Sequence, residues 1–436
     1  MNSLKTLLKS IALAAMCSSL VLATGCSKQA SDNHKNTAIV ANSGNITVYR
    51  YDGGTVGALS HDDDWYSNFL NYYQKEYGGT VTAVAVEWQE WEKKFNNDLA
   101  SGTAPDLIHL FEKNYYNLLR RDLLVPMEEM TQKGVTGINH PSLLLRQNLA
   151  ADLYSHNGKT YAFACAYAEA DMIFVNEDLF EQYGQTSPYE YYTAGQWNYN
   201  TFLECADSMT RDIDGDGRIE LNGFYGYDPS TFVSAAGGQL VTLDANGQLV
   251  SNLKDKGTLQ GLKNYRQLYS GGYTTDYYSR WLNGKVAMVG WLPQNEYSNL
   301  ANNRLPFEWS MVPFPLDSTN SDGVRPGKCY GWAVTRAGVN WQGCINYVIA
   351  LNAYEVIEPD HSQPNYSSLF STIQLEMIYD CTQNIRLPYY NAVGNLKNTQ
   401  WNMWGALADG KNSFEKGIEL IEKEINLQIE AETKSN

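Results

Sequence analysis

The chain after residue 45 alternates between two hydrophobic periodicities. Short runs such as ITVYRY have apolar residues at every second position, as strands do, and longer runs have them three and four positions apart, as amphipathic helices do. The order is strand, helix, strand, helix, strand, over residues 46–51, 64–79, 80–88, 90–102 and 105–111. This order predicts a parallel sheet covered by helices. The second strand is rich in Val and Ala, so we expect it to be buried on both faces.

Ligands of such sheets bind outside the carboxyl ends of the strands. The segments expected at this mouth follow Tyr51, Trp88 and Leu110. Glu112 is the best polar candidate for ligand contact, and Trp88 is an aromatic one. His109 fits a core or edge position better. Trp91 falls on the buried stripe of the predicted helix.

The middle of the chain has a different pattern. Asn157-Gly158 predicts a hairpin with a type I′ turn, and an extended run then ends at Asn176. A helix is expected to begin there, because Glu177 and Asp178 would lie in its first turn, where the helix dipole favours acids. Further strands are predicted at 284–291, 308–316 and 330–335, and further helices at 342–353, 367–379 and 413–429.

The first 25 residues have the pattern of an export signal. Lys5 and Lys9 form a basic start, and the apolar segment over 11–23 is too short for a settled transmembrane helix. We therefore expect the protein to leave the cytosol.

The end of this signal resembles the lipobox of bacterial lipoproteins. Small residues, Thr24 and Gly25, precede Cys26, although Leu22 stands one place earlier than the pattern usually has it. The resemblance implies that Cys26 becomes the acylated first residue and that residues 27–45 form a flexible tether. The alternative is a plain secreted protein.

Composition narrows the class of partner. The formal net charge is −16, and removal of residues 1–25, which contain two lysines and no acids, makes it −18. No Lys/Arg cluster is longer than Arg120-Arg121, so we do not expect a nucleic-acid partner. About 390 residues remain after the tether, which suggests two lobes at roughly 100 to 200 residues per domain.

Cysteine and aromatic usage add to this picture. The exported body contains five cysteines, at positions 165, 205, 329, 344 and 381. Their odd number and wide spacing match neither a disulfide framework nor a zinc site, so we expect buried free thiols. The 31 Tyr and 11 Trp exceed what a core of this size needs. Aromatic rings stack on the apolar faces of sugars, so this excess favours a carbohydrate ligand.

Several segments, in this order, resemble a known family. They are SGTAPDLIHLF, LLRRDLLVPMEEM, YAFACAYAEADMIFVNEDLFEQYG, QWNYNTFLECADSM and WLNGKVAMVGW. The set is similar to the family-1 extracellular solute-binding proteins, the carbohydrate-binding lipoproteins of ABC importers that include maltodextrin-binding proteins. The resemblance implies an α/β, two-lobed fold of the periplasmic-binding-protein type (type II), each lobe a mainly parallel sheet flanked by helices, with a hinge between the lobes.

The lobes are expected to be built from separate stretches of chain. We expect residues 46–169 and 286–329 in the N-terminal lobe, and residues 170–285 and 330–436 in the C-terminal lobe. A solute that touches both lobes favours the closed state, which a permease can recognise.

The resemblance also implies ligand-binding residues. Glu169 matches a sugar-contacting carboxylate of maltodextrin-type relatives, and with period two Tyr167 and Asp171 share its side of the extended run. Trp291 matches a stacking aromatic residue, and Trp332 lies near the last crossover. The alternatives are a solvated acid for Glu169 and core positions for the tryptophans.

The stretch RDIDGDGRIELNG has the first half of a calcium loop. Asp212, Asp214, Asp216 and Glu220 stand at ligand positions, but Gly223 replaces the glutamate that normally closes the site. The loop is either a structural calcium site or a solvated turn.

These patterns predict a lipid-anchored, extracytoplasmic receptor that captures a sugar or an oligosaccharide, needs no cofactor and delivers its ligand to an ABC permease as a monomer. The motifs GxSxG and HExxH, the P-loop and a GxGxxG after a strand are absent from the sequence, so we do not expect an enzyme. A glycoside hydrolase remains an alternative, since it needs only two suitably placed carboxylates. A carbohydrate-binding surface sensor or adhesin is another.

Overall fold

The computed structural model describes residues 44–434 except 52–62, 88–89, 144–150, 152, 227–228, 245–246, 276–277, 291–304, 359–369, 387–392, 394–404, 406 and 409–411. The chain forms two compact units. Unit 1 comprises Met1–Ala168 and Cys329–Glu376, and unit 2 comprises Glu169–Lys328 and Met377–Asn436. The chain thus passes between the units three times, within strand β6 (Ala164–Ala170), strand β13 (Gly327–Val334) and helix α17 (Thr372–Thr382).

Unit 1 contains a five-stranded sheet in the order β2-β1-β3-β13-β6. Strand β1 (Ile46–Tyr51) is parallel to β2 (Val81–Val86) and to β3 (Leu107–Leu110), as the sequence predicts. Strand β13 joins antiparallel to β3. Because β2 lies at the edge of the sheet, most of its residues are only half-buried or exposed, and the predicted burial on both faces is wrong.

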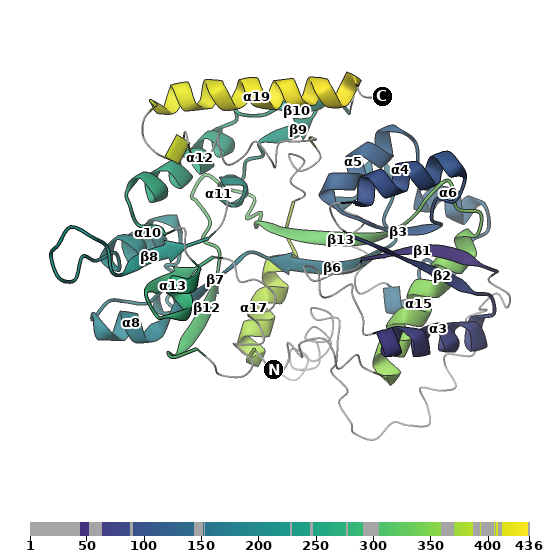
Figure 1. Cartoon of the computed structure of the whole chain (residues 1–436), viewed down its shortest axis with the longest axis horizontal. Coiled ribbons are helices and arrows are strands. Elements are labelled where there is room, and N and C mark those ends of the chain that lie inside the picture. Colours follow the sequence, from purple (N-terminus) through teal and green to yellow (C-terminus); the bar gives the residue numbers. More distant parts are fainter. Residues whose placement is uncertain are drawn as a thin grey trace. The chain divides into compact units, whose positions relative to one another are not determined.

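Helices cover both faces of this sheet (Figure 1). On one face lie α4 (Trp91–Ser101) and α5 (Glu112–Arg120), and on the other lie α3 (Asp63–Tyr77) and α15 (Trp341–Ile357). A short helix, α6 (Met127–Gln132), follows α5. The hairpin of β4 (Ser155–His156) and β5 (Lys159–Thr160) has positive φ angles at both turn residues, 50° at Asn157 and 71° at Gly158, which confirms the predicted turn.

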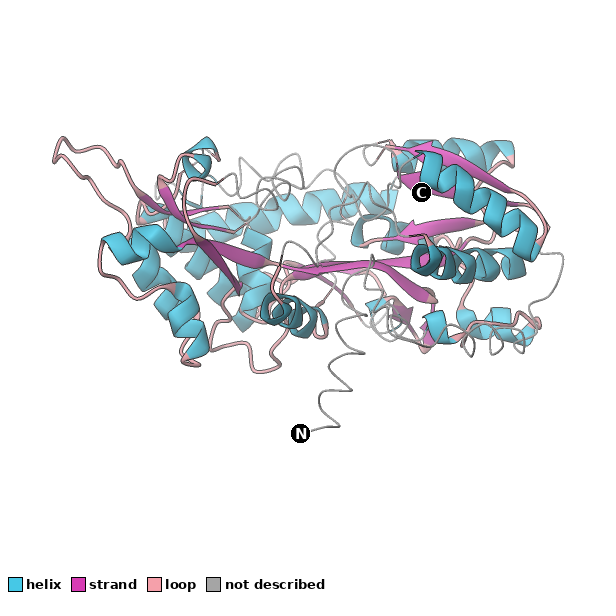
Figure 2. Cartoon of the chain, turned by 90° about the horizontal axis from the view of Figure 1, so that it is seen from below, coloured by secondary structure: helices cyan, strands magenta, loops and turns pink. Residues whose placement is uncertain are grey.

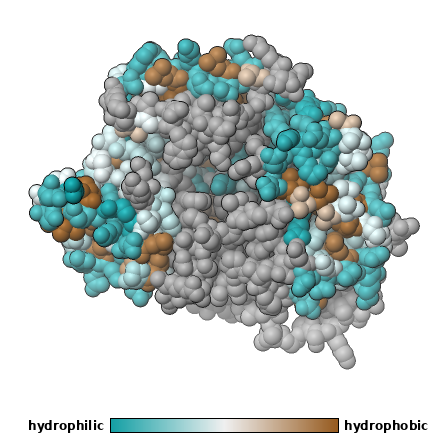
Figure 3. Space-filling view, viewed as in Figure 1, coloured by the Kyte–Doolittle hydropathy of each residue, from teal (hydrophilic) through white to brown (hydrophobic). Residues whose placement is uncertain are grey.

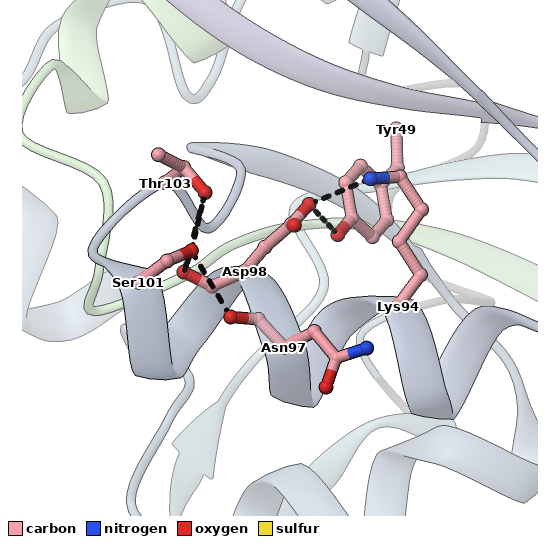
Figure 4. Close-up of polar contacts among 6 residues, drawn as sticks. All are labelled: Tyr49, Lys94, Asn97, Asp98, Ser101 and Thr103. Atoms are coloured by element: carbon pink, nitrogen blue, oxygen red, sulfur yellow. Dashed lines mark hydrogen bonds and ion pairs between the residues drawn. The ribbon is translucent and has the colours of Figure 1, made fainter.

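Side-chain hydrogen bonds fasten α4 to the sheet and end it (Figure 4). The Tyr49 hydroxyl donates to Asp98 Oδ2 at 2.7 Å, and Lys94 Nζ lies 2.9 Å from the same oxygen. At the end of the helix, Ser101 Oγ donates to the carbonyls of Asn97 and Asp98, and Gly102 adopts a left-handed conformation that stops the helix. Burial and the Asp98 carboxylate raise the pKa of Tyr49, so its hydroxyl keeps its proton.

Unit 2 contains a four-stranded sheet in the order β12-β7-β11-β8. Strand β7 (Met172–Asn176) is antiparallel to both β11 (Val286–Val289) and β12 (Trp309–Pro313), and only β11 and β8 (Asn222–Tyr225) are parallel. This sheet is therefore mixed, which differs from the mainly parallel sheet predicted for each lobe. A small antiparallel pair, β9 (Val241–Leu243) and β10 (Leu249–Ser251), completes the strands described in unit 2.

Four phenylalanines pack together in the core of unit 2. Phe202 and Phe232 contact Phe314 with ring centroids 6.0 and 5.1 Å away, and Phe224 packs on Phe202 at 5.1 Å. The helices of unit 2, shown with its strands in Figure 2, are α8 (Glu177–Gln182), α9 (Pro188–Thr193), α10 (Tyr199–Ser208), α11 (Pro229–Ala235), α12 (Lys256–Ser270), α13 (Ser279–Leu282) and α19 (Phe414–Lys434). As predicted, α8 begins at Asn176, whose side chain accepts a hydrogen bond from Leu179 N.

The predicted assignment of the later segments to the lobes is wrong. Residues 286–328 belong to unit 2, because β11 and β12 hydrogen-bond to β7. Residues 330–376 belong to unit 1, because β13 pairs with β3. Within the described residues, Cys205, Cys329, Cys344 and Cys381 are buried free thiols, as predicted. None of the helices described is long and apolar enough to cross a membrane.

Candidate functional site

A polar and aromatic cluster lies near the carboxyl ends of β1 and β3 in unit 1. Val48 is paired with Leu107, so two residues further along these parallel strands Arg50 and His109 come into the same register. His109 is in turn paired with Trp332 of β13. Since alternate residues share a face, the three side chains lie in one row across the sheet.

Two helices complete this row. The Trp332 ring lies 5.9 Å from that of Tyr347 on α15, and the Tyr347 hydroxyl is 3.0 Å from the Tyr66 hydroxyl on α3. The Arg50 guanidinium lies 4.5 Å above the Tyr66 ring. We call Arg50, Tyr66, His109, Trp332 and Tyr347 the unit 1 cluster.

Burial sets the charge state of the two phenols in this cluster. It raises the pKa of Tyr66 and holds that of Tyr347 well above its usual range, so both hydroxyls are neutral hydrogen-bonding groups. The cluster thus places one guanidinium and two phenol hydroxyls at the predicted mouth of unit 1. The prediction from sequence did not include Arg50, Tyr66 or Tyr347. One feature of the sequence could have pointed to the cluster. Arg50 is charged, but the alternation of the strand places it on the same face as the apolar Ile46 and Val48.

The structure places Trp332 in the core of unit 1. The indole is 6% exposed and packs against His109 and Tyr347, so it has a packing role here, and its predicted ligand contact stays a prediction. His109 is also buried, as expected of a core residue. Trp91 is 4% exposed and stacks on Phe95 at 5.0 Å, which confirms its place on the buried stripe of α4.

Glu112 is the first residue of α5 and is only 4% exposed. Its carboxylate lies at the positive end of the helix dipole, which stabilises a buried negative charge. The segment before it is held in place by Asn114, whose Oδ1 accepts from Phe111 N and whose Nδ2 donates to the His109 carbonyl, both at 2.9 Å.

Asp171 connects β6 to β7 and is fixed within unit 2. Its Oδ2 accepts a hydrogen bond from Thr231 Oγ1 at 2.8 Å. Its main chain donates to the Pro326 carbonyl and accepts from Phe314 N. Asp171 therefore presents a carboxylate of fixed orientation at the point where the chain enters unit 2.

The other predicted ligand residues are less fully described. Tyr167 and Glu169 are residues of strand β6, and the structure describes their main chain but not their side chains. Trp88 and Trp291 lie outside the described residues, as does Cys26.

The acidic loop of residues 211–221 projects beside β8 and α10 in unit 2 (Figure 1). Asp212, Asp214, Asp216 and Glu220 each offer an oxygen within 4.8 Å of the others. These carboxylates also hold the loop itself, since Asp212 accepts from Gly215 N at 2.7 Å and from Gly217 N at 2.8 Å. The spacing predicted from the sequence is thus present, and calcium binding stays a prediction.

Two α/β units between which the chain passes three times form a two-lobed architecture. The chain belongs to the family of bacterial extracellular solute-binding proteins, whose family model matches residues 58–355. This confirms the resemblance drawn from the sequence. None of the curated protein sequences compared with the chain matches it.

Solved structures share the fold at low sequence identity. The sugar-binding protein MalE of Xanthomonas citri has a TM-score of 0.65 at 13% identity, over 89% of this chain and 98% of that one. An ABC substrate-binding protein of Listeria monocytogenes in complex with cycloalternan has 0.61 at 14%, over 88% and 98%. The MalE domain of Bdellovibrio bacteriovorus bound to maltotriose has 0.58 at 15%, over 88% and 100%.

Proposed function

We propose that this protein is the substrate-binding component of an ABC importer for a sugar, and more narrowly for an oligosaccharide. The observation that carries the proposal is the family match over residues 58–355. It is supported by the ligands of proteins with the same fold, which include cycloalternan and maltotriose. The aromatic excess of the sequence agrees with ligands made of several sugar rings.

In the proposed mechanism the ligand binds the closed form of the two units better than the open form. The population then shifts towards closure, and the permease recognises the closed form. The three passages of the chain, in β6, β13 and α17, are the segments in which the hinge would lie. No bond in the sugar changes, so the protein acts as a carrier and has no need of a catalytic acid or cofactor.

We propose Glu169, Tyr167, Asp171 and Trp291 as principal ligand contacts, with Glu112 and Trp88 contributing from unit 1. A carboxylate accepts hydrogen bonds from two hydroxyls of a sugar, and an indole covers an apolar ring face. The fixed orientation of Asp171 supports this assignment, because a preorganised acceptor loses little conformational freedom on binding.

We further propose that acylation of Cys26 anchors the protein to the outer face of the cell membrane as a monomer. Residues 27–45 would then act as a tether that allows the folded body to reach the permease. At the end of this tether Asn45 is held by unit 1, since its Oδ1 accepts from Thr80 N and its carbonyl accepts from Asn340 Nδ2.

Small-angle X-ray scattering of the purified protein tests the closure mechanism. Maltotriose or maltotetraose, added in turn, should reduce the radius of gyration if one of them is a ligand that closes the units. A ligand shown by calorimetry to bind while the radius of gyration stays constant would overturn the closure mechanism and leave sugar binding intact.

A further inference from the structure

Tyrosine side chains gather at the carboxyl end of β8 in unit 2. Tyr225 is the last residue of β8 and is only half-buried, whereas the three residues before it are buried. The centroid of the Tyr278 ring lies 5.8 Å from that of Tyr225, and the Tyr269 hydroxyl donates to the Gly226 carbonyl at 2.9 Å. The end of this strand is therefore lined by aromatic rings that are not among the predicted ligand residues.

This end of β8 lies at the edge of the sheet where ligands are expected. Strands β8 and β11 are parallel and pair Tyr225 with Val289, so their carboxyl ends lie at the same edge. Strand β7 runs the other way beside β11 and pairs Phe174 with Val289. The start of β7, and Asp171 just before it, therefore lie beyond this same edge.

Asp171 is also tied to the segment that follows β8. Thr231 belongs to α11, the next helix after β8, and its Oγ1 donates to Asp171 Oδ2 at 2.8 Å. In the sheet only β11 stands between β7 and β8, so these two strands are about 10 Å apart. A carboxylate and a phenol ring thus lie within the reach of one oligosaccharide, and both belong to unit 2.

The Tyr225 ring is held in one place. Its main chain is fixed at the strand end, because Gly290 N donates to the Tyr225 carbonyl at 2.7 Å. Tyr278 packs against the ring with an angle of 48° between the two planes, and the Tyr278 hydroxyl oxygen is buried, so Tyr278 supports Tyr225 with its ring. A ring fixed in this way loses little conformational freedom when a ligand stacks on it.

We propose that Tyr225 stacks on one ring of the oligosaccharide whose hydroxyls donate to Asp171, with Tyr278 as the residue that positions Tyr225. This role rests on the proposed function and adds an aromatic contact within unit 2. An aromatic ring covers the apolar C–H face of a sugar. The exposed apolar residues of α19, in contrast, stand singly among polar ones (Figure 3), and isolated residues of this kind are ordinary on protein surfaces.

Isothermal titration of the purified full chain with maltotriose and maltotetraose tests this role. Tyr225→Ala should weaken binding by about tenfold, and Tyr225→Phe, which keeps the ring, should bind as the parent protein does. The matched control is Tyr191→Ala, which removes a half-buried tyrosine of α9 and should leave the affinity unchanged. Helix α9 starts at Ser187, whose side chain contacts Glu177 at the other end of β7.

The positioning role of Tyr278 is tested by a double-mutant cycle. Tyr278→Ala should weaken binding in the parent protein and have no further effect on Tyr225→Ala, whereas Tyr278→Phe should bind as the parent protein does. A general loss of structure would weaken both backgrounds, and the melting temperature of each variant reports it separately. An additional loss of affinity from Tyr278→Ala on the Tyr225→Ala background would contradict the positioning role.

If Tyr225→Ala does not fold, Tyr225→Leu keeps apolar packing against Tyr278 without an aromatic ring and should weaken binding in the same way. A parent protein that binds a sugar, with equal affinity in the folded alanine or leucine variant, would overturn the stacking role and leave the proposed function intact. If the parent protein binds no sugar, the proposed function and the stacking role are both overturned.

Discussion

The imidazole of His109 and the indole of Trp332 lie with their ring centroids 3.8 Å apart, on paired residues of the antiparallel strands β3 and β13. Both side chains are buried. This contact joins the first part of unit 1 to a strand that arrives more than two hundred residues later in the chain, so it holds together a unit made of two separate segments.

The first prediction concerns Trp332. Trp332→Ala should lower the free energy of unfolding by about 3 to 5 kcal/mol, because it leaves a cavity beside His109 and Tyr347. Trp332→Phe retains most of the apolar contact and should cost clearly less. Urea unfolding checks both. Loss of sugar binding without loss of stability would instead make Trp332 a ligand contact.

The second prediction concerns the ion pair of Arg336 with Glu129. The guanidinium lies 3.1 and 2.9 Å from the two carboxylate oxygens of Glu129, and it also contacts Asp122. The hydrogen bonds from Arg336 lower the pKa of Glu129. The stabilisation that this ion pair gives the folded protein is therefore complete above the pKa of Glu in the unfolded chain, about 4.3. It is lost as the pH falls through the lower pKa that Glu129 has in the folded protein.

Glu129→Gln should accordingly cost about 0.5 to 1 kcal/mol at neutral pH, and the difference from the parent protein should vanish in acid. Urea unfolding across this pH range is the measurement, and the exposed Glu87→Gln is the control. If the difference in stability between the parent protein and Glu129→Gln does not change with pH, the ion pair of Arg336 with Glu129 is not its cause.

The third prediction concerns the acidic loop. The two carboxylate oxygens of Asp212 accept from Gly215 N and Gly217 N, and Asp212→Asn replaces one of them with an amide NH₂ group, which is a donor. The substitution should lower the free energy of unfolding by about 1 kcal/mol even with a chelator present. If the loop also binds calcium, the ion should raise the melting temperature of the parent protein and not that of the variant. A loss of stability seen only with calcium present would contradict the role of these hydrogen bonds.

The fourth prediction concerns the anchor. Cys26→Ala should abolish incorporation of labelled palmitate in a bacterial host and release the protein from the membrane fraction. Cys344→Ala, at a fully buried thiol, is the control and should keep the label. Labelling that persists in Cys26→Ala would contradict acylation at this residue.

Local elements of the fold could be predicted from the sequence, because periodicity and turn chemistry act over short distances. The strand over Ile46–Tyr51 has the predicted bounds, and the hairpin at Asn157-Gly158 and the helix start at Asn176 are confirmed. The division into lobes was wrong for β11, β12 and β13. Their apolar runs predict strands but do not determine which strand each one pairs with.

The candidate site shows the same limit. Glu112 could be found as an acid after a predicted strand and Asp171 by its alternation with Glu169 in an extended run, but the unit 1 cluster depends on long-range neighbours. Arg50 meets Tyr66 from α3, and Trp332 meets His109 only because β13 inserts beside β3. Such contacts follow from tertiary packing, which the periodicity of a single segment does not encode.

The most direct test of the central claim is isothermal titration of the purified protein with a panel of mono- and oligosaccharides, followed by analysis of the sugar recovered from each mixture. The account predicts saturable binding of a sugar that is recovered intact, and marked weakening of that binding by Trp291→Ala or Glu169→Ala. Cleavage of the sugar during the titration, or no binding to any member of the panel, would contradict it.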